Sequence, residues 1–176
     1  MNYVKRVVID TGTLISAAIR VHSVPSLAYQ KALRDYEICI SEQTFYELAT
    51  VLMRAKFDKY LNREDRERFV ADYKSIAVVY DVSYTVNDCR DSNDNMFLEL
   101  ALSAKADVII SSDPDLYSMN PYQNIPIVQP VYFLQNIDDI REHIKRNYSV
   151  PLFNKEGLGE ILLDKSPSIP LFQRWR

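Results

Sequence analysis

Four carboxylate side chains have the type and placement that metal-dependent phosphate chemistry requires: Asp10, Glu47, Asp94 and Asp113. Each follows a predicted strand, opens a predicted helix or lies on the polar face of one. Carboxylates gathered without a cation repel one another, so proteins keep such groups mainly where a metal ion or a shared proton compensates. Oxygen ligands without His or Cys suit magnesium or manganese rather than zinc. Such ions bridge a phosphodiester and activate a water molecule, which predicts hydrolysis of phosphate esters.

Each acid also has a structural interpretation when it is considered alone. Asp10, Asp94 and Asp113 each precede a predicted helix and would serve as ordinary N-caps or turn residues. Glu47 would be a solvated residue on a helix surface. The metal-site hypothesis therefore depends on all four side chains meeting at one place in the fold.

The elements that must bring these acids together alternate along the chain. An apolar, β-branched run from Tyr3 to Ile9 predicts a buried strand with Asp10 at its carboxyl end. Further strands are expected at 37–40, 76–80, 107–110 and 125–128, and helical patterns occupy 13–34 with a break near Pro25, 41–53, 62–75, 97–102 and 131–136. This alternation predicts an α/β fold with a central parallel sheet flanked by helices, a three-layer α/β/α arrangement. Acids at the carboxyl ends of its strands would share one edge of the sheet.

Composition indicates an ordinary folded chain of one compact domain. The 176 residues are 47% hydrophobic and 26% charged and include only 3 glycines, which excludes long flexible linkers. No apolar run is long enough for a membrane helix, and Asp10 interrupts the short N-terminal apolar stretch, so we expect a cytoplasmic protein. Cys39 and Cys89 lack a CxxC partner, which favours a reduced compartment. The net charge of −3 does not point to a nucleic-acid binder, but metal ions on the acids would reverse the local sign.

The chain divides by character near residue 136. Residues 1–136 carry the alternating pattern, whereas 137–176 begin as a charged helical stretch and continue as a tail that contains Pro. This extension includes Leu152, Phe153 and Trp175 and is too apolar for a disordered end. We expect it to pack on the domain or on a partner.

Four blocks of the sequence, taken in order, resemble the PIN-domain family, and in particular its small bacterial branch of toxins from toxin–antitoxin pairs. The blocks are VVIDTGTLISA (7–17), ISEQTFYELATVL (40–52), CRDSNDNMFLELALSAKADVIISSDPDL (89–116) and IPIVQPVYFL (125–134). The resemblance places the metal-binding acids at Asp10, Glu47, Asp94 and Asp113. Supporting positions are Asp91, Asp115 and either Ser111 or Ser112, since the family often has a Thr at the place of these serines.

The resemblance also implies an activity and partners. It implies a ribonuclease that prefers single-stranded RNA, uses magnesium or manganese, leaves a 5′-phosphate, and often forms a homodimer inhibited by a cognate antitoxin. The sequence departs from the family at Gly12, because the usual motif is Asp-Thr-Asn and the Asn side chain is missing here. This departure concerns the positioning of the first loop rather than the acids themselves.

Two other functions remain open on sequence alone. The first is a PIN-fold module without activity that binds RNA or protein. The second is a phosphatase like the haloacid dehalogenases, because VVIDTGTL resembles the first motif of that family. In this chain, however, Gly12 stands where those enzymes have the Asp that donates a proton.

Substrate-binding candidates come from a basic stretch that begins with Arg54 and Lys56. It continues with Lys59, Arg63, Arg66 and Arg68 and is interleaved with acids. A solvated, salt-bridged helix surface is therefore the better interpretation for the whole stretch.

Overall fold

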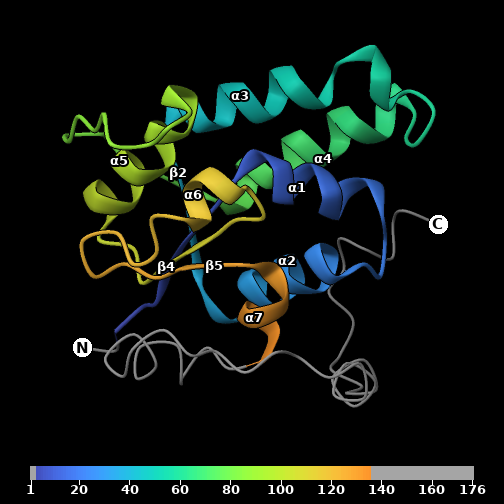
Figure 1. The fold of residues 1–176 in the computed structure, drawn as a ribbon. Helices are drawn as coiled ribbons and strands as arrows, with labels where there is room; N and C mark the ends of the chain where they lie inside the picture. Colours follow the sequence, from blue (N-terminus) through green and yellow to red (C-terminus); the bar gives the residue numbers. More distant parts are fainter. Residues whose placement is uncertain (1–2, 136–176) are drawn as a thin grey trace.

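The strands form one parallel sheet. The computed structural model describes residues 3–135 (Figure 1). Its five strands lie in the order β3-β2-β1-β4-β5, and every neighbouring pair is parallel. They are β1 (Arg6–Ile9), β2 (Glu37–Ile40), β3 (Val78–Val79), β4 (Val108–Ile110) and β5 (Ile127–Val128). All five expected strands are present, although β3 and β5 are only two residues long.

The helices begin at the caps that the sequence offers. Ser41 and the Thr44 side chain form a capping box at the start of α3, and Asn62 caps α4. Pro25 lies in the first turn of α2 behind the cap Ser23, so the expected helix break is the start of a new helix. The helices are α1 (Thr11–Ile19), α2 (Val24–Asp35), α3 (Glu42–Leu52), α4 (Arg63–Ile76), α5 (Asn95–Ala104), α6 (Pro114–Tyr117) and α7 (Pro130–Gln135), with 3-10 turns η1 (Ala55–Phe57) and η2 (Ser92–Asp94).

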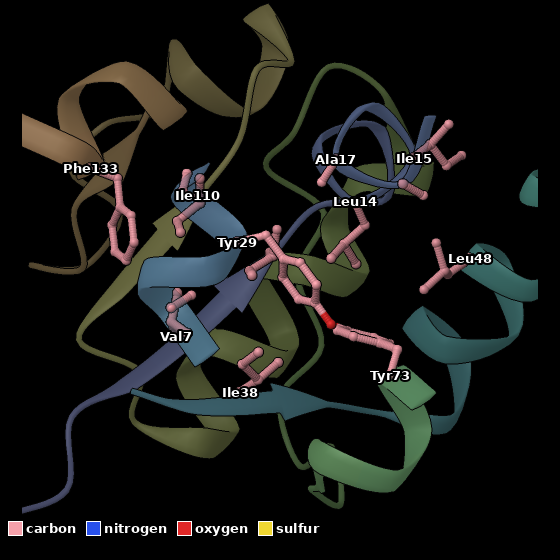
Figure 2. Close-up of a cluster of buried hydrophobic side chains, with 14 of the residues drawn as sticks. Val7, Leu14, Ile15, Ala17, Tyr29, Ile38, Leu48, Tyr73, Ile110 and Phe133 are labelled. Carbon is pink, nitrogen blue, oxygen red and sulfur yellow. The ribbon is translucent and has the colours of Figure 1, made fainter. Parts of the chain in front are cut away.

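Alternate residues of the strands enter two separate cores. Val7 and Ile9 of β1 pack in one core with α1, α2, α3, α4 and α7, and Val8 faces the second core with α5 and α6. Figure 2 shows the first core, where the rings of Tyr29 of α2 and Tyr73 of α4 lie next to each other, with their centroids 6.1 Å apart. Each face of the sheet is thus covered by helices, and the predicted three-layer α/β/α fold is confirmed.

The strand order reverses between β1 and β4. The chain leaves β1 towards β2 and β3 on one side, and it later adds β4 and β5 on the other. The two connections diverge at the carboxyl ends of β1 and β4, where open α/β sheets bind ligands. Asp10 directly follows β1, and Ser111 directly follows β4.

The extension expected at 137–176 lies outside the described residues, as does the end of the first domain at residue 136. Among residues 3–135, no helix is long and apolar enough to cross a membrane.

Candidate functional site

Asp10 and Ser111 meet at the strand reversal. The Asp10 backbone amide donates to the Ile110 carbonyl at 3.0 Å, which fixes the residue against β4. Its carboxylate accepts hydrogen bonds from the Thr13 amide at 2.6 Å and from the Ser111 hydroxyl. Asp10 is therefore an N-cap of α1, as its structural interpretation predicted, and it is also buried at the place where a ligand would bind.

Ser111 links the first acid to the last. Its hydroxyl donates to Asp10 and accepts the Asp113 amide at 3.0 Å. Asp113 caps α6 through the Asp115 amide at 2.8 Å. Of the two serines that the sequence left open, Ser111 is fully buried and makes these contacts, whereas Ser112 is exposed.

Glu47 reaches the site from α3. Its Oε2 accepts a hydrogen bond from the Thr11 hydroxyl, in the turn that follows Asp10. Sequence reasoning missed the role of Thr11, and the only available signal was its place in the first motif. Glu47 is half-buried, and its pKa is raised mainly by this burial and further by the charge of Asp10, while the Thr11 hydrogen bond and Arg54 oppose the rise.

Asp94 does not perform the capping role that its sequence position suggests. It lies at the last position of η2 in a helical conformation, and its side chain makes no capping hydrogen bond to α5. Its Oδ2 is buried and has no hydrogen-bond partner among residues 3–135. A buried carboxylate oxygen without a donor is costly, so this atom is available to a partner other than residues 3–135.

The charges of the acids act on one another. The pKa of Asp94 is raised to about 7, first by burial and then by the negative charges of Asp113, Asp91, Asp10 and Glu47. The pKa of Asp10 is raised by burial and, to a smaller degree, by Asp113, against the hydrogen bonds from Ser111 and Thr13. Asp10 after β1, Glu47 of α3, Asp94 of η2 and Asp113 after β4 therefore lie close enough for their charges to interact.

These acids are close without forming a finished metal cage. Within the described part of the chain, no three His, Cys, Asp or Glu side chains form a ready-made group for one ion. Oxygens of Asp10 and Glu47 are occupied by hydrogen bonds from their own domain. The donor chemistry nevertheless fits magnesium or manganese, because the ligands are all carboxylates and Asp94 presents an unpartnered oxygen.

The supporting acids have separate contacts. Asp91 caps η2 by accepting the Asn93 amide at 2.9 Å, and its charge reaches Asp94 and Glu47. Asp115 pairs with Arg90 and holds Asp113 through its backbone amide. Arg90 had no distinguishing signal in the sequence.

Most of the basic stretch is a salt-bridged surface, as expected. Arg63 pairs with Glu67, and Arg68 pairs with Glu64 and Asp65 on α4. Arg66 is buried and pairs with Asp58. Arg54 and Lys56 are exposed.

Cys39 and Cys89 are buried free thiols, as expected for core residues.

The departure at Gly12 leaves open space beside Asp10. Gly12 is a helical residue of α1 with negative φ, and an added Cβ would meet only the two Asp10 carboxylate oxygens, both at 4.0 Å. We expect Gly12→Ala to raise the free energy of unfolding by about 0.5 kcal/mol, because alanine restricts the unfolded chain without a clash. Urea denaturation measures this change. If Gly12→Ala were less stable than the wild type, the alanine side chain would not fit beside Asp10.

The fold and the site together define a class of protein: an α/β/α domain with a parallel sheet and acidic residues at the point where the strand order reverses. The PIN domain family model matches residues 6–115, and the chain belongs to this family. The predicted resemblance is confirmed. A relative, the uncharacterized protein MJ1680 of Methanocaldococcus jannaschii, is 32% identical over 119 residues, which cover 65% of this chain and 74% of the relative.

Two solved structures are similar in outline. VapBC2 from Rickettsia felis, bound to a DNA fragment from its promoter, matches 70% of this chain and 98% of its own with 13% identity and a TM-score of 0.49. PAE2754 from Pyrobaculum aerophilum matches 81% of this chain and 96% of its own with 14% identity and a TM-score of 0.46. Both scores are below 0.5, so these likenesses bear on neither the site nor the activity.

Proposed function

We propose that this chain is a metal-dependent endoribonuclease that cleaves single-stranded RNA. The observation that carries the proposal is the electrostatic cluster of Asp10, Glu47, Asp94 and Asp113 at the strand reversal. Membership of the PIN domain family supports a nuclease. Magnesium or manganese held by these four acids would supply charge to bind the scissile phosphate and to lower the pKa of an attacking water.

The other residues of the site hold the acids in place. Ser111 orients the Asp10 carboxylate and the Asp113 backbone, and Thr11 orients Glu47. The amide of Thr13 keeps the other oxygen of Asp10 towards the first turn of α1. Such contacts matter because partners that orient a ligand typically change metal affinity or activity about 10- to 100-fold when they are removed.

The sequence blocks further support a toxin of a type II toxin–antitoxin pair, which would act as a homodimer and bind a cognate antitoxin protein. Size-exclusion chromatography with light scattering tests the dimer. A monomer at micromolar concentration would contradict it.

The activity is tested with a labelled single-stranded RNA and the purified chain in magnesium, manganese or EDTA. We expect cleavage with either metal and none in EDTA. Asp10→Asn should lose the activity, whereas the matched control Asp35→Asn should keep it, because Asp35 pairs with Arg34 at the end of α2, ahead of the amino end of β2. Equal cleavage by the wild type and Asp10→Asn would identify a contaminating nuclease, and no cleavage in any metal would favour an inactive binding module.

A further inference from the structure

One face of α3 carries an exposed aromatic ring beside Glu47. Tyr46 is 73% exposed, more than any other large hydrophobic side chain among residues 3–135. Its neighbours on the solvent side of the helix, Gln43 and Thr50, are also exposed. An isolated exposed ring is ordinary on a protein surface, so its meaning depends on its surroundings.

The surroundings of Tyr46 connect it to the acidic cluster. Helical positions advance by about 100° per residue, so Gln43, Tyr46, Glu47 and Thr50 share one side of α3. The helix starts at Ser41, directly after the carboxyl end of β2, and helical side chains tilt towards the N-terminus of their helix. Tyr46 therefore stands on the same side of the helix as Glu47, and the general tilt directs it towards the N-terminal end of α3, which follows the carboxyl end of β2.

Positive charge lies just beyond the end of α3. Arg54 is exposed and follows Met53, the C-cap of α3, and its charge acts on the Glu47 carboxylate. Within the described residues, no carboxylate lies within ion-pair distance of Arg54, in contrast to Arg63, Arg66 and Arg68. The exposed Lys56 follows it, with its ammonium group 4.9 Å from the centre of the Phe57 ring.

The backbone under Arg54 is rigidly held. The buried guanidinium of Arg66 donates to the carbonyls of Leu52 at 3.0 Å and Arg54 at 3.2 Å. Arg66 thus holds the backbone of the turn after α3 through these two hydrogen bonds, while the Arg54 side chain is exposed to solvent. A guanidinium that has no ion-pair partner among residues 3–135 and sits on a fixed backbone is suited to binding a phosphate group.

We propose that the exposed face of α3 and the turn that follows it bind single-stranded RNA, with a base stacked on Tyr46 and a backbone phosphate on Arg54. This inference rests on the proposed function and assigns its substrate contacts. Stacking requires an unpaired base, so the site selects single strands over duplexes. The combination of an exposed ring and an exposed cation favours RNA over a protein partner, because a protein would need no phosphate-binding group.

The test is binding of a fluorescein-labelled single-stranded oligoadenylate in an Asp94→Asn background, which prevents cleavage. We expect Tyr46→Ala to weaken affinity about 5- to 100-fold, because a stacked base contributes about 1–3 kcal/mol. Tyr46→Phe should bind as the parent does, whereas Tyr46→Leu should be as weak as Tyr46→Ala, since it keeps apolar area without a ring. Replacement of an adenine by 2-aminopurine adds a spectroscopic readout, with quenching on binding that is lost in Tyr46→Ala.

Two further variants sharpen the experiment. Arg54→Ala should reduce the slope of log affinity against log salt by about 0.7, while Tyr46→Ala leaves the slope unchanged. The matched control is Tyr84→Ala, because Tyr84 is 50% exposed and follows Ser83, whose amide binds the Ser103 hydroxyl at the end of α5 remote from Asp94. This control should bind RNA like the parent.

The outcomes separate this inference from the proposed function. Equal RNA affinity of Tyr46→Ala and Tyr46→Phe would overturn the stacking site, even if the wild type cleaves RNA. The same equality is expected if this face binds a partner protein instead of RNA. A Tyr46-dependent affinity in a chain that cleaves nothing would support the binding face and refute the nuclease. Equal losses on duplex and single-stranded RNA would overturn the selection of single strands.

Discussion

Replacing Asp94 with Asn is expected to stabilise the metal-free protein at neutral and alkaline pH while reducing RNA cleavage more than about 100-fold. The folded protein holds the Asp94 proton more tightly than the unfolded chain does, since burial and neighbouring acids raise its pKa from 3.8 to about 7. Asparagine keeps the shape of the side chain and removes the charge. The same charge that destabilises the empty fold is the charge that would bind a cation.

The sign of the pH dependence follows from linkage. Below about pH 4 the carboxyl is protonated in both states, so Asp94→Asn should change little there. As the pH rises from 4 through 7, the unfolded chain ionises first and the wild type loses stability relative to the variant. One pKa unit corresponds to about 1.4 kcal/mol. Partial exposure and salt screening reduce the total, so we expect a gain of about 1–2 kcal/mol at pH 8.

Urea denaturation in EDTA at pH 4 and pH 8 measures this effect, with Asp35→Asn as the exposed control. Manganese should then raise the melting temperature of the wild type more than that of Asp94→Asn, because an ion stabilises only the state that binds it. A variant less stable than the wild type at pH 8 would show that Asp94 has a stabilising partner in the fold. Asp94 would then not be a cation ligand.

The predictable part of the site consists of residues that end a strand. A continuous apolar run such as Val7 to Ile9 is typical of a strand buried on both faces, so the place of Asp10 follows from the sequence. The strand order cannot be predicted from the sequence in this way, because the helix that connects two parallel strands has the same local pattern whichever strands it connects. The meeting of Asp10 with Ser111, which are 101 residues apart, therefore required the structure.

Asp94 shows a second limit. An Asp before an apolar helix predicts an N-cap, but η2 runs directly into α5, and Asp94 already has helical backbone angles. A capping residue needs an extended conformation to aim its side chain at the first amides. Asp91 has that conformation and caps η2 instead, which leaves the Asp94 carboxylate for the cluster.

Arg66 shows a third limit, since it belongs to the same charged pattern as its exposed neighbours on α4. The sequence indicates a solvated surface for the whole stretch, and this is correct for Arg63 and Arg68. Arg66 is only 2% exposed, because the turn between α3 and α4 folds its carbonyls over the guanidinium. Helical periodicity within α4 does not encode the position of that turn.

Arg66→Met is therefore expected to destabilise the protein by about 2–4 kcal/mol. Methionine fills a similar volume but removes the donors for the Leu52 and Arg54 carbonyls and the ion pair with Asp58. An unsatisfied buried polar group costs about 1–3 kcal/mol. Because the turn also carries Arg54, the variant should bind single-stranded RNA more weakly even at a temperature where it remains folded.

The matched control is Arg63→Met on the same helix. Arg63 pairs with Glu67 at 2.8 Å, but the two side chains are 78% and 56% exposed. Such surface pairs contribute about 0.5 kcal/mol or less. Urea denaturation of the two variants should thus separate a charge that holds a turn together from one that only covers a helix. Equal stabilities of Arg66→Met and Arg63→Met would mean that water replaces the Arg66 guanidinium at the two carbonyls. The backbone at Arg54 would then be held by other contacts.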